Sequence, residues 1–117
     1  MAVNYICPDR VFGRGCDFAR VSGNDHAQLF EMKTCRLTAG DATNTVRRLS
    51  TTKETLKSNN LVRPSCAFTM WLIHEKTGSC GVDTIASAIL EGAKVKLSNY
   101  DHPEVREVYQ EYRRRCK

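Results

Sequence analysis

Cysteine and histidine are the most reactive side chains in this sequence, and their spacing limits the chemistry they can do. A tetrahedral zinc site needs closely spaced ligand pairs, such as two cysteines separated by two residues. No such pair occurs among six cysteines and three histidines, so we predict no metal site and no cofactor. These residues are Cys7, Cys16, Cys35, Cys66, Cys80 and Cys116, with His26, His74 and His102.

The same cysteines could instead form disulfides, which need an oxidising compartment. Residues 1–8 have neither the basic region nor the long apolar region of a secretory signal. We therefore expect a protein made in a reducing cytoplasm, with most cysteines buried as free thiols. The longest apolar run, near Ala67–Ile73, is too short to cross a bilayer, so no membrane contact is predicted.

Motifs of known enzyme classes are absent from the sequence. It has no nucleophile elbow, no phosphate-binding loop and no zinc-protease helix. The segment Gly13-Arg14-Gly15 resembles part of a glycine loop but lacks the following helix that would aim amide groups at phosphate. We therefore predict a protein that is not an enzyme and has no small-molecule substrate. A thiol-dependent or metal-dependent enzyme, testable at Cys16, Cys66 and Cys80, stays open as a third hypothesis.

Arginine and hydroxyl side chains give a signal for nucleic-acid binding. The net charge of +5 and the isoelectric point near 9.0 suit an anionic partner. Arginine pairs with phosphate, and serine and threonine bond to base edges and 2′-hydroxyls. The alternative is that threonine is only a good strand former on a solvated face. Alternation along the expected strands places on one face the residues Thr34, Arg36, Arg48, Ser50, Thr52 and Thr69, with Lys53 near the edge.

The elements that would position these side chains are strands up to about residue 75. Turn clusters separate them, and tight turns join antiparallel neighbours, so we expect an N-terminal hairpin followed by an antiparallel meander. Within this sheet Thr45–Lys57 is predicted as a threonine-rich strand and Val62–Glu75 as the most apolar one. In the latter, Phe68, Met70 and Leu72 share one face.

After residue 77 the hydrophobic period becomes helical. Val82, Ile85, Ile89 and Leu90 lie on one stripe of a helix expected at about 79–95. A capping box at Asp101-His102-Pro103-Glu104 predicts a second helix at about 102–116. Together these patterns predict a single α+β domain over residues 1–117, with both helices on one face of the sheet and the other face free.

The order of these elements resembles a known family. Lys33–Thr38, Val46–Lys57 and Arg63–Ile73 look like the three central strands of the coat proteins of single-stranded RNA bacteriophages (levivirus-like). Thr77–Ala93 falls where that family places its first helix. The likeness covers about residues 27–95 and rests on sequential pattern.

The resemblance implies an interlocked homodimer with a continuous antiparallel sheet, which assembles into an icosahedral capsid. The free sheet face would then line the shell and bind single-stranded genomic RNA or an operator hairpin. The expected location is the virion, assembled in the host cytoplasm. By strand position the RNA contacts would be Thr34, Arg36, Arg48, Ser50, Thr52 and Thr69, with Lys53 as a further candidate. The alternative is a small basic regulatory module that binds nucleic acid or protein and forms no shell.

Overall fold

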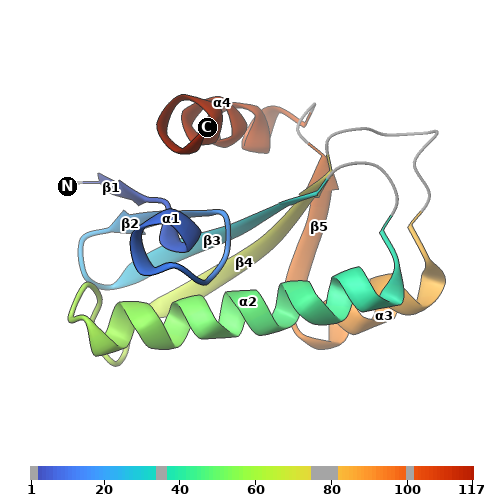
Figure 1. Ribbon diagram of the computed structural model, residues 1–117, viewed down its shortest axis with the longest axis horizontal. Helices are drawn as coiled ribbons and strands as arrows, with labels where there is room; N and C mark the ends of the chain where they lie inside the picture. Colours follow the sequence, from blue (N-terminus) through green and yellow to red (C-terminus); the bar gives the residue numbers. More distant parts are fainter. Residues whose placement is uncertain (1–2, 34–36, 75–81, 100–101) are drawn as a thin grey trace.

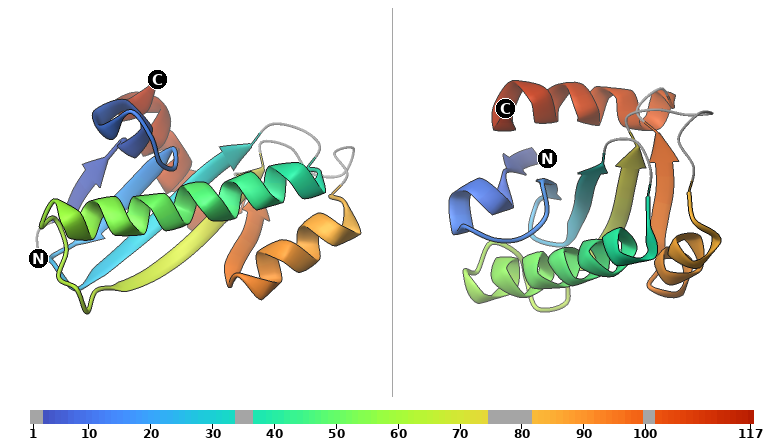
Figure 2. Two further views of the ribbon diagram at one scale, coloured as in Figure 1. Left: turned by 60° about the horizontal axis from the view of Figure 1, so that its bottom comes forward. Right: turned by 45° about the vertical axis from the view of Figure 1, so that its right-hand side comes forward.

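The protein folds as three layers, with helices on both faces of one β-sheet (Figure 1). The computed structural model describes residues 3–33, 37–74, 82–99 and 102–117. Figure 2 shows α2 and α3 side by side on one face and α4 alone on the other. The elements are β1 (Val3–Ile6), α1 (Pro8–Phe12), β2 (Phe18–Ser22), β3 (His26–Lys33), α2 (Ala39–Ser58), β4 (Ala67–His74), α3 (Thr84–Gly92), β5 (Val95–Asn99) and α4 (Pro103–Cys116).

The sheet is mixed, so the α+β class is right and the prediction of an antiparallel sheet is wrong. Its five strands lie in chain order, β1-β2-β3-β4-β5. The pairs β1–β2 and β2–β3 are antiparallel, whereas β3–β4 and β4–β5 are parallel. Two parallel neighbours need a long crossover, and α2 supplies it between β3 and β4.

Helix α2 occupies the segment predicted as a strand at Thr45–Lys57, which is the largest error in the sequence-based fold. A capping box begins it: Thr38 Oγ1 accepts from Asp41 N at 3.2 Å, and Asp41 Oδ2 accepts from Thr38 N at 3.0 Å. Its threonines fit a helix because Thr52 and Thr55 donate to backbone oxygens four residues earlier. The side chains that it buries follow a helical period: Ala42, Thr45, Leu49, Thr52, Thr55 and Leu56.

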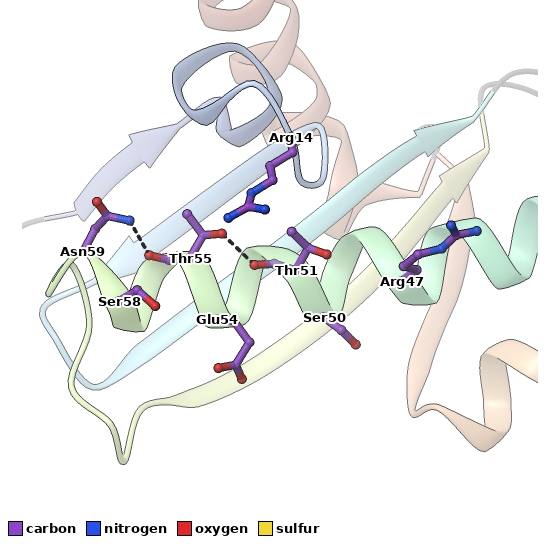
Figure 3. A pocket seen from close by; sticks show the side chains of 8 residues that line it. All are labelled: Arg14, Arg47, Ser50, Thr51, Glu54, Thr55, Ser58 and Asn59. Atoms are coloured by element: carbon purple, nitrogen blue, oxygen red, sulfur yellow. Dashed lines mark hydrogen bonds between the residues drawn. The ribbon is translucent and has the colours of Figure 1, made fainter.

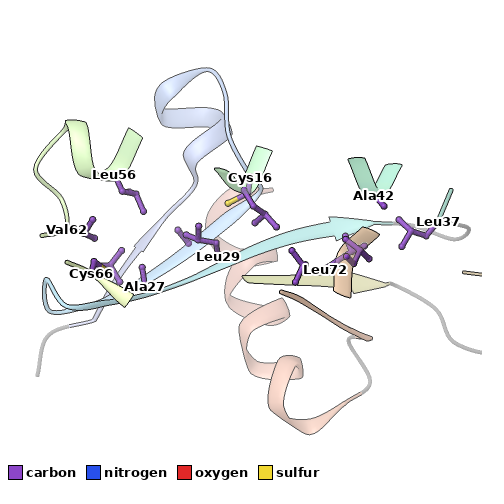
Figure 4. Packing of buried hydrophobic residues seen from close by; sticks show 14 of the residues in the cluster. Cys16, Ala27, Leu29, Leu37, Ala42, Leu56, Val62, Cys66 and Leu72 are labelled. Carbon is purple, nitrogen blue, oxygen red and sulfur yellow. The ribbon is translucent and has the colours of Figure 1, made fainter. Parts of the chain in front are cut away.

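Each face of the sheet has its own apolar cluster. The prediction that one face is free is therefore wrong. Alternation along β4 sends Leu72 toward α2 and α3, and sends Trp71 and Ile73 toward α4. Figure 4 shows Leu29, Leu56 and Leu72 packed between α2 and the sheet. The second cluster lies beneath α4 and contains Phe18, Phe30, Ile73, Val105, Val108 and Tyr112.

The two predicted C-terminal helices exist, but they lie on opposite faces. Helix α4 buries the expected stripe of Val105, Val108 and Tyr112. Helix α3 begins at an Asp83 cap and is shorter than predicted, since residues 95–99 form strand β5. Of the expected stripe on this helix, Leu90 is buried, whereas Ile85 is 62% exposed in the single chain.

One pair of cysteines is bonded, a point that the sequence left open. Cys7 and Cys116 form a disulfide that joins the start of α1 to the end of α4. Cys16 and Cys66 are free and buried, as expected, whereas Cys35 and Cys80 lie outside the described residues. Within the described ranges, no helix combines the length and apolar character that a bilayer crossing requires.

Candidate functional site

A buried carboxylate interrupts the apolar strand β3. Glu31 is only 1% exposed although it stands between Phe30 and Met32. Alternation puts its side chain on the same face as Leu29, beneath α2. An ionisable group at such a position is costly unless it is paired or binds a ligand.

The β2–β3 hairpin brings a second carboxylate to Glu31. Asp17 directly precedes β2, and its Oδ2 accepts a 2.8 Å hydrogen bond from the backbone N of Met32 on β3. The pKa of Glu31 is raised to about 9, chiefly by burial and also by the neighbouring Asp17 carboxylate. The positive charges of Arg48 and Lys33 act against this increase.

Arg48 reaches the two acids from α2. Its Nε lies 3.2 Å from Glu31 Oε2, but its single N–H donates to the backbone oxygen of Gly15 at 2.9 Å. Neither oxygen of Glu31 therefore has a hydrogen-bond donor within the described part of the chain. The terminal nitrogen of Arg48 lies 3.7 Å from Asp17 and 3.8 Å from Asp9. The site thus places one arginine among three acids, and the oxygens of one of these carboxylates can still bind a ligand.

A close approach between α2 and the loop before β2 holds Arg48 in place. Thr52 Oγ1 accepts from the backbone N of Cys16 at 2.7 Å. Gly15 has a φ of +114°, and a Cβ there would lie 2.7 Å from Thr52 Oγ1, so only glycine fits. The Cys16 thiol is not a candidate nucleophile, because burial raises its pKa to about 12.

A cationic pocket of about 370 Å³ lies beside the two acids. Lys33 is two residues beyond Glu31 on β3, so it shares the face beneath α2, and its Nζ lies 3.9 Å from Asp41. Four of the lining side chains carry positive charge, and none carries negative charge. The lining consists of Arg14, Gly15, Lys33, Asn44, Arg47, Arg48 and Thr51.

The residues predicted to bind RNA do not form one surface in this fold. Thr34 and Arg36 lie outside the described residues. Arg48, Ser50, Thr52 and Lys53 are on α2 rather than on a strand. Thr69 alone of the predicted set is on a described strand, β4, on the α4-facing side.

Their individual surroundings differ as well. Arg48 is at the acidic centre, whereas Thr52 is fully buried and bonded within the protein. Lys53 Nζ lies 5.5 Å from the centre of the Phe68 ring. Thr69 shares a 3.1 Å hydrogen bond with His26 Nε2. Ser50 is on the exposed side of α2. RNA binding by these residues stays a prediction.

Sequence reasoning missed the acidic centre. Asp17, Glu31 and Lys33 were not candidates, although one signal was present in the sequence. A charged residue at the middle of an apolar strand, followed two residues later by a lysine, indicates a buried charge with a specific role. The missing step was the strand pairing, which places Asp17 beside Met32.

Two carboxylates suit one class of metal ion. Among the described residues, no group of three or more histidine, cysteine or acidic side chains is placed to hold a metal. Magnesium, however, is usually bound by one or two carboxylates together with water and substrate phosphates. Asp17 and Glu31 would supply two carboxylates for such an ion. The positively charged side chains of the adjacent pocket suit a phosphate.

Comparison with known proteins gives no match to a family model, a curated protein or a solved structure. The functional conclusion therefore depends on the chemistry of the site.

Proposed function

We propose that this protein hydrolyses phosphodiester bonds in nucleic acid, using Mg²⁺ or Mn²⁺ bound by Asp17 and Glu31. The observation that carries the proposal is the buried Glu31, whose oxygens lack hydrogen-bond donors within the described residues. It lies next to a pocket lined by four positively charged side chains. A nucleic-acid phosphate would fit between these groups, since it can ligate the metal and pair with arginine at once.

A bound divalent cation would explain why two acids are placed together in an apolar environment. Without it, the acids repel each other and burial favours protonated Glu31, whose pKa is raised to about 9. A divalent cation would replace the proton and compensate both negative charges. When bound, it would polarise the phosphoryl group and lower the pKa of a bound water.

The chain's own residues would perform the other tasks. Arg47 and Arg48, which line the pocket, would hold the phosphate oxygens, and Lys33 would stabilise the charge that develops as the water oxygen bonds to phosphorus. The bond from phosphorus to the leaving sugar oxygen then breaks. That oxygen takes up a proton, and the attacking water releases one to solvent.

The capsid prediction has less support in this fold. It requires a sheet face that is open to RNA, whereas α2 and α3 cover one face and α4 packs on the aromatic cluster of the other. A non-catalytic binding module would also use the cationic pocket. It differs from our proposal in one respect, because it predicts binding without cleavage.

The test incubates labelled single-stranded and double-stranded DNA and RNA with the protein in Mg²⁺, Mn²⁺ or a chelator. We expect cleavage only with a divalent cation, and a loss of at least about a hundredfold in Asp17→Asn and Glu31→Gln. Glu91→Gln, an exposed acid on α3, is the matched control and should cleave normally.

A second measurement separates the metal site from activity. Isothermal titration calorimetry with Mn²⁺ should show binding to the wild type and to Glu91→Gln but not to Glu31→Gln. No cleavage of any substrate, or full activity in both site variants, would refute the proposal.

A further inference from the structure

A second groove runs along the exposed side of α2, away from the acidic centre (Figure 3). Its volume is about 420 Å³, and Arg14 extends over it from the loop between α1 and β2. The lining has hydroxyl, amide and guanidinium groups but no aromatic ring. It consists of Arg14, Arg47, Ser50, Thr51, Glu54, Thr55, Ser58 and Asn59.

The groove is continuous with the cationic pocket. Both are lined by Arg14, Arg47 and Thr51, so these three residues form a shared wall. A chain molecule that places one phosphate in the pocket would therefore pass along α2 toward Ser58 and Asn59. The lining residues follow one side of the helix at intervals of three and four, which gives an extended path rather than a closed cavity.

The two arginines of the shared wall are not neutralised by any acid that the structure describes. Within the described residues, no carboxylate lies within ion-pair distance of Arg14 or Arg47. Arg47 donates to the neutral side chain of Asn44. Exposed arginines without acidic partners are the groups that pair with phosphate in nucleic-acid complexes.

The hydroxyl and amide groups suit the same ligand. Thr55 Oγ1 and Asn59 Nδ2 already donate to backbone oxygens of α2, and the hydroxyl-bearing residues Ser50, Thr51 and Ser58 also line the groove. Such groups contact phosphate and sugar without reading bases. Because the lining has no ring on which a base could stack, the groove fits the backbone of the strand.

We infer that this groove binds the sugar–phosphate backbone of the strand beside the cleaved phosphate, independently of base sequence. The inference rests on the proposed function and extends it to the neighbouring nucleotides. Glu54 is the single acid in the lining and opposes this ligand. It limits the affinity, so its removal should tighten binding.

The experiment measures binding in a chelator, where no cleavage occurs, using labelled single-stranded oligo(dT) and oligo(dC). Arg14→Ala and Arg47→Ala should each weaken binding about fivefold to tenfold and reduce the slope of log K against log salt by about 0.7. Glu54→Gln should tighten binding about twofold to threefold.

Arg113→Ala is the matched control, because Arg113 is an exposed arginine on α4, across the sheet from α2. It should bind as the wild type does. The inference is overturned if the arginine variants bind normally, or if they lose affinity for only one of the two oligonucleotides. Failure of cleavage with this binding pattern retained would refute only the proposed hydrolysis.

Discussion

The two faces of the sheet differ in chemistry although the same strands build both. The face beneath α4 is aromatic: Tyr5 and Phe18 stack at 5.4 Å between ring centres, and Tyr112 meets Phe18 edge-on at 5.8 Å. The buried residues beneath α2 are mainly aliphatic, but Glu31 and Arg48 form an ion pair there, and Arg48 also lines the cationic pocket.

This difference shows how one short strand can serve stability and chemistry at once. In β3, Phe30 and Met32 contact the aromatic cluster, whereas Glu31 and Lys33 turn toward α2. Substitutions on the α4 side should therefore change the free energy of unfolding. Substitutions at the acidic centre should change the pH dependence of the free energy of unfolding and the proposed hydrolysis.

The largest effect is expected on the aromatic face. Tyr112→Ala removes a buried ring beside Phe18 and should lower the free energy of unfolding by about 3–5 kcal/mol. Urea denaturation measures this change, and Gln110→Ala, exposed on the same helix, is the control. An unchanged urea midpoint would mean that α4 contributes little to the core.

The disulfide on the same face should have the next largest effect. Replacing Cys7 and Cys116 together by serine should cost about 2–4 kcal/mol, because the unfolded chain is no longer cross-linked. Thermal unfolding measures it, and reduced wild-type protein should match the variant. Equal stability of the oxidised and reduced wild type would contradict the expectation.

The acidic centre should instead show a pH effect. Glu31 has a pKa of about 9 when folded, against its ordinary 4.5. Between these values the folded protein holds a proton that the unfolded chain lacks. The stability from this group is therefore fully present below about pH 4.5 and is lost as pH rises toward 9.

Glu31→Gln removes this dependence. In a chelator, the stability of the variant relative to the wild type should increase by about 2 kcal/mol between roughly pH 6 and pH 7.5, since each pH unit between the two pKa values corresponds to about 1.4 kcal/mol. Urea denaturation at each pH measures it. Parallel curves for the two proteins would show that Glu31 is ionised throughout.

The smallest effect is expected where α2 meets the loop before β2. Thr52→Val leaves the buried N–H of Cys16 without its acceptor and should cost about 1–2 kcal/mol. Thr43→Val, an exposed threonine of the same helix, is the control for helix propensity. Equal urea midpoints for the two variants would show that the Cys16 bond adds nothing.

Part of the fold could be predicted from the sequence. Helix α4 was found because its apolar stripe has aliphatic and aromatic members, and the faces of β4 were found because Phe68, Met70 and Leu72 alternate clearly. Helix α2 was missed because threonine stands at buried positions such as Thr45 and Thr52. Threonine favours strands, which hid both the helical period and the capping box at Thr38.

The acidic centre depended on that missed helix. With residues 45–57 predicted as a strand, Arg48 could not be placed over β3, and no crossover indicated parallel pairing. Asp17 and Glu31 meet only through the register of the β2–β3 hairpin, in which Phe18 pairs with Phe30. Local patterns do not fix that register, so the convergence of the two acids required the folded arrangement.

The bond between Cys7 and Cys116 converts most of the polypeptide into a covalent ring, since 109 positions separate the two sulfurs in sequence. A single proteolytic cut within that ring, for example at the exposed turn formed by Gly23 and Asn24, would leave both fragments attached. The nicked protein would migrate as one species on a non-reducing gel and as two after reduction.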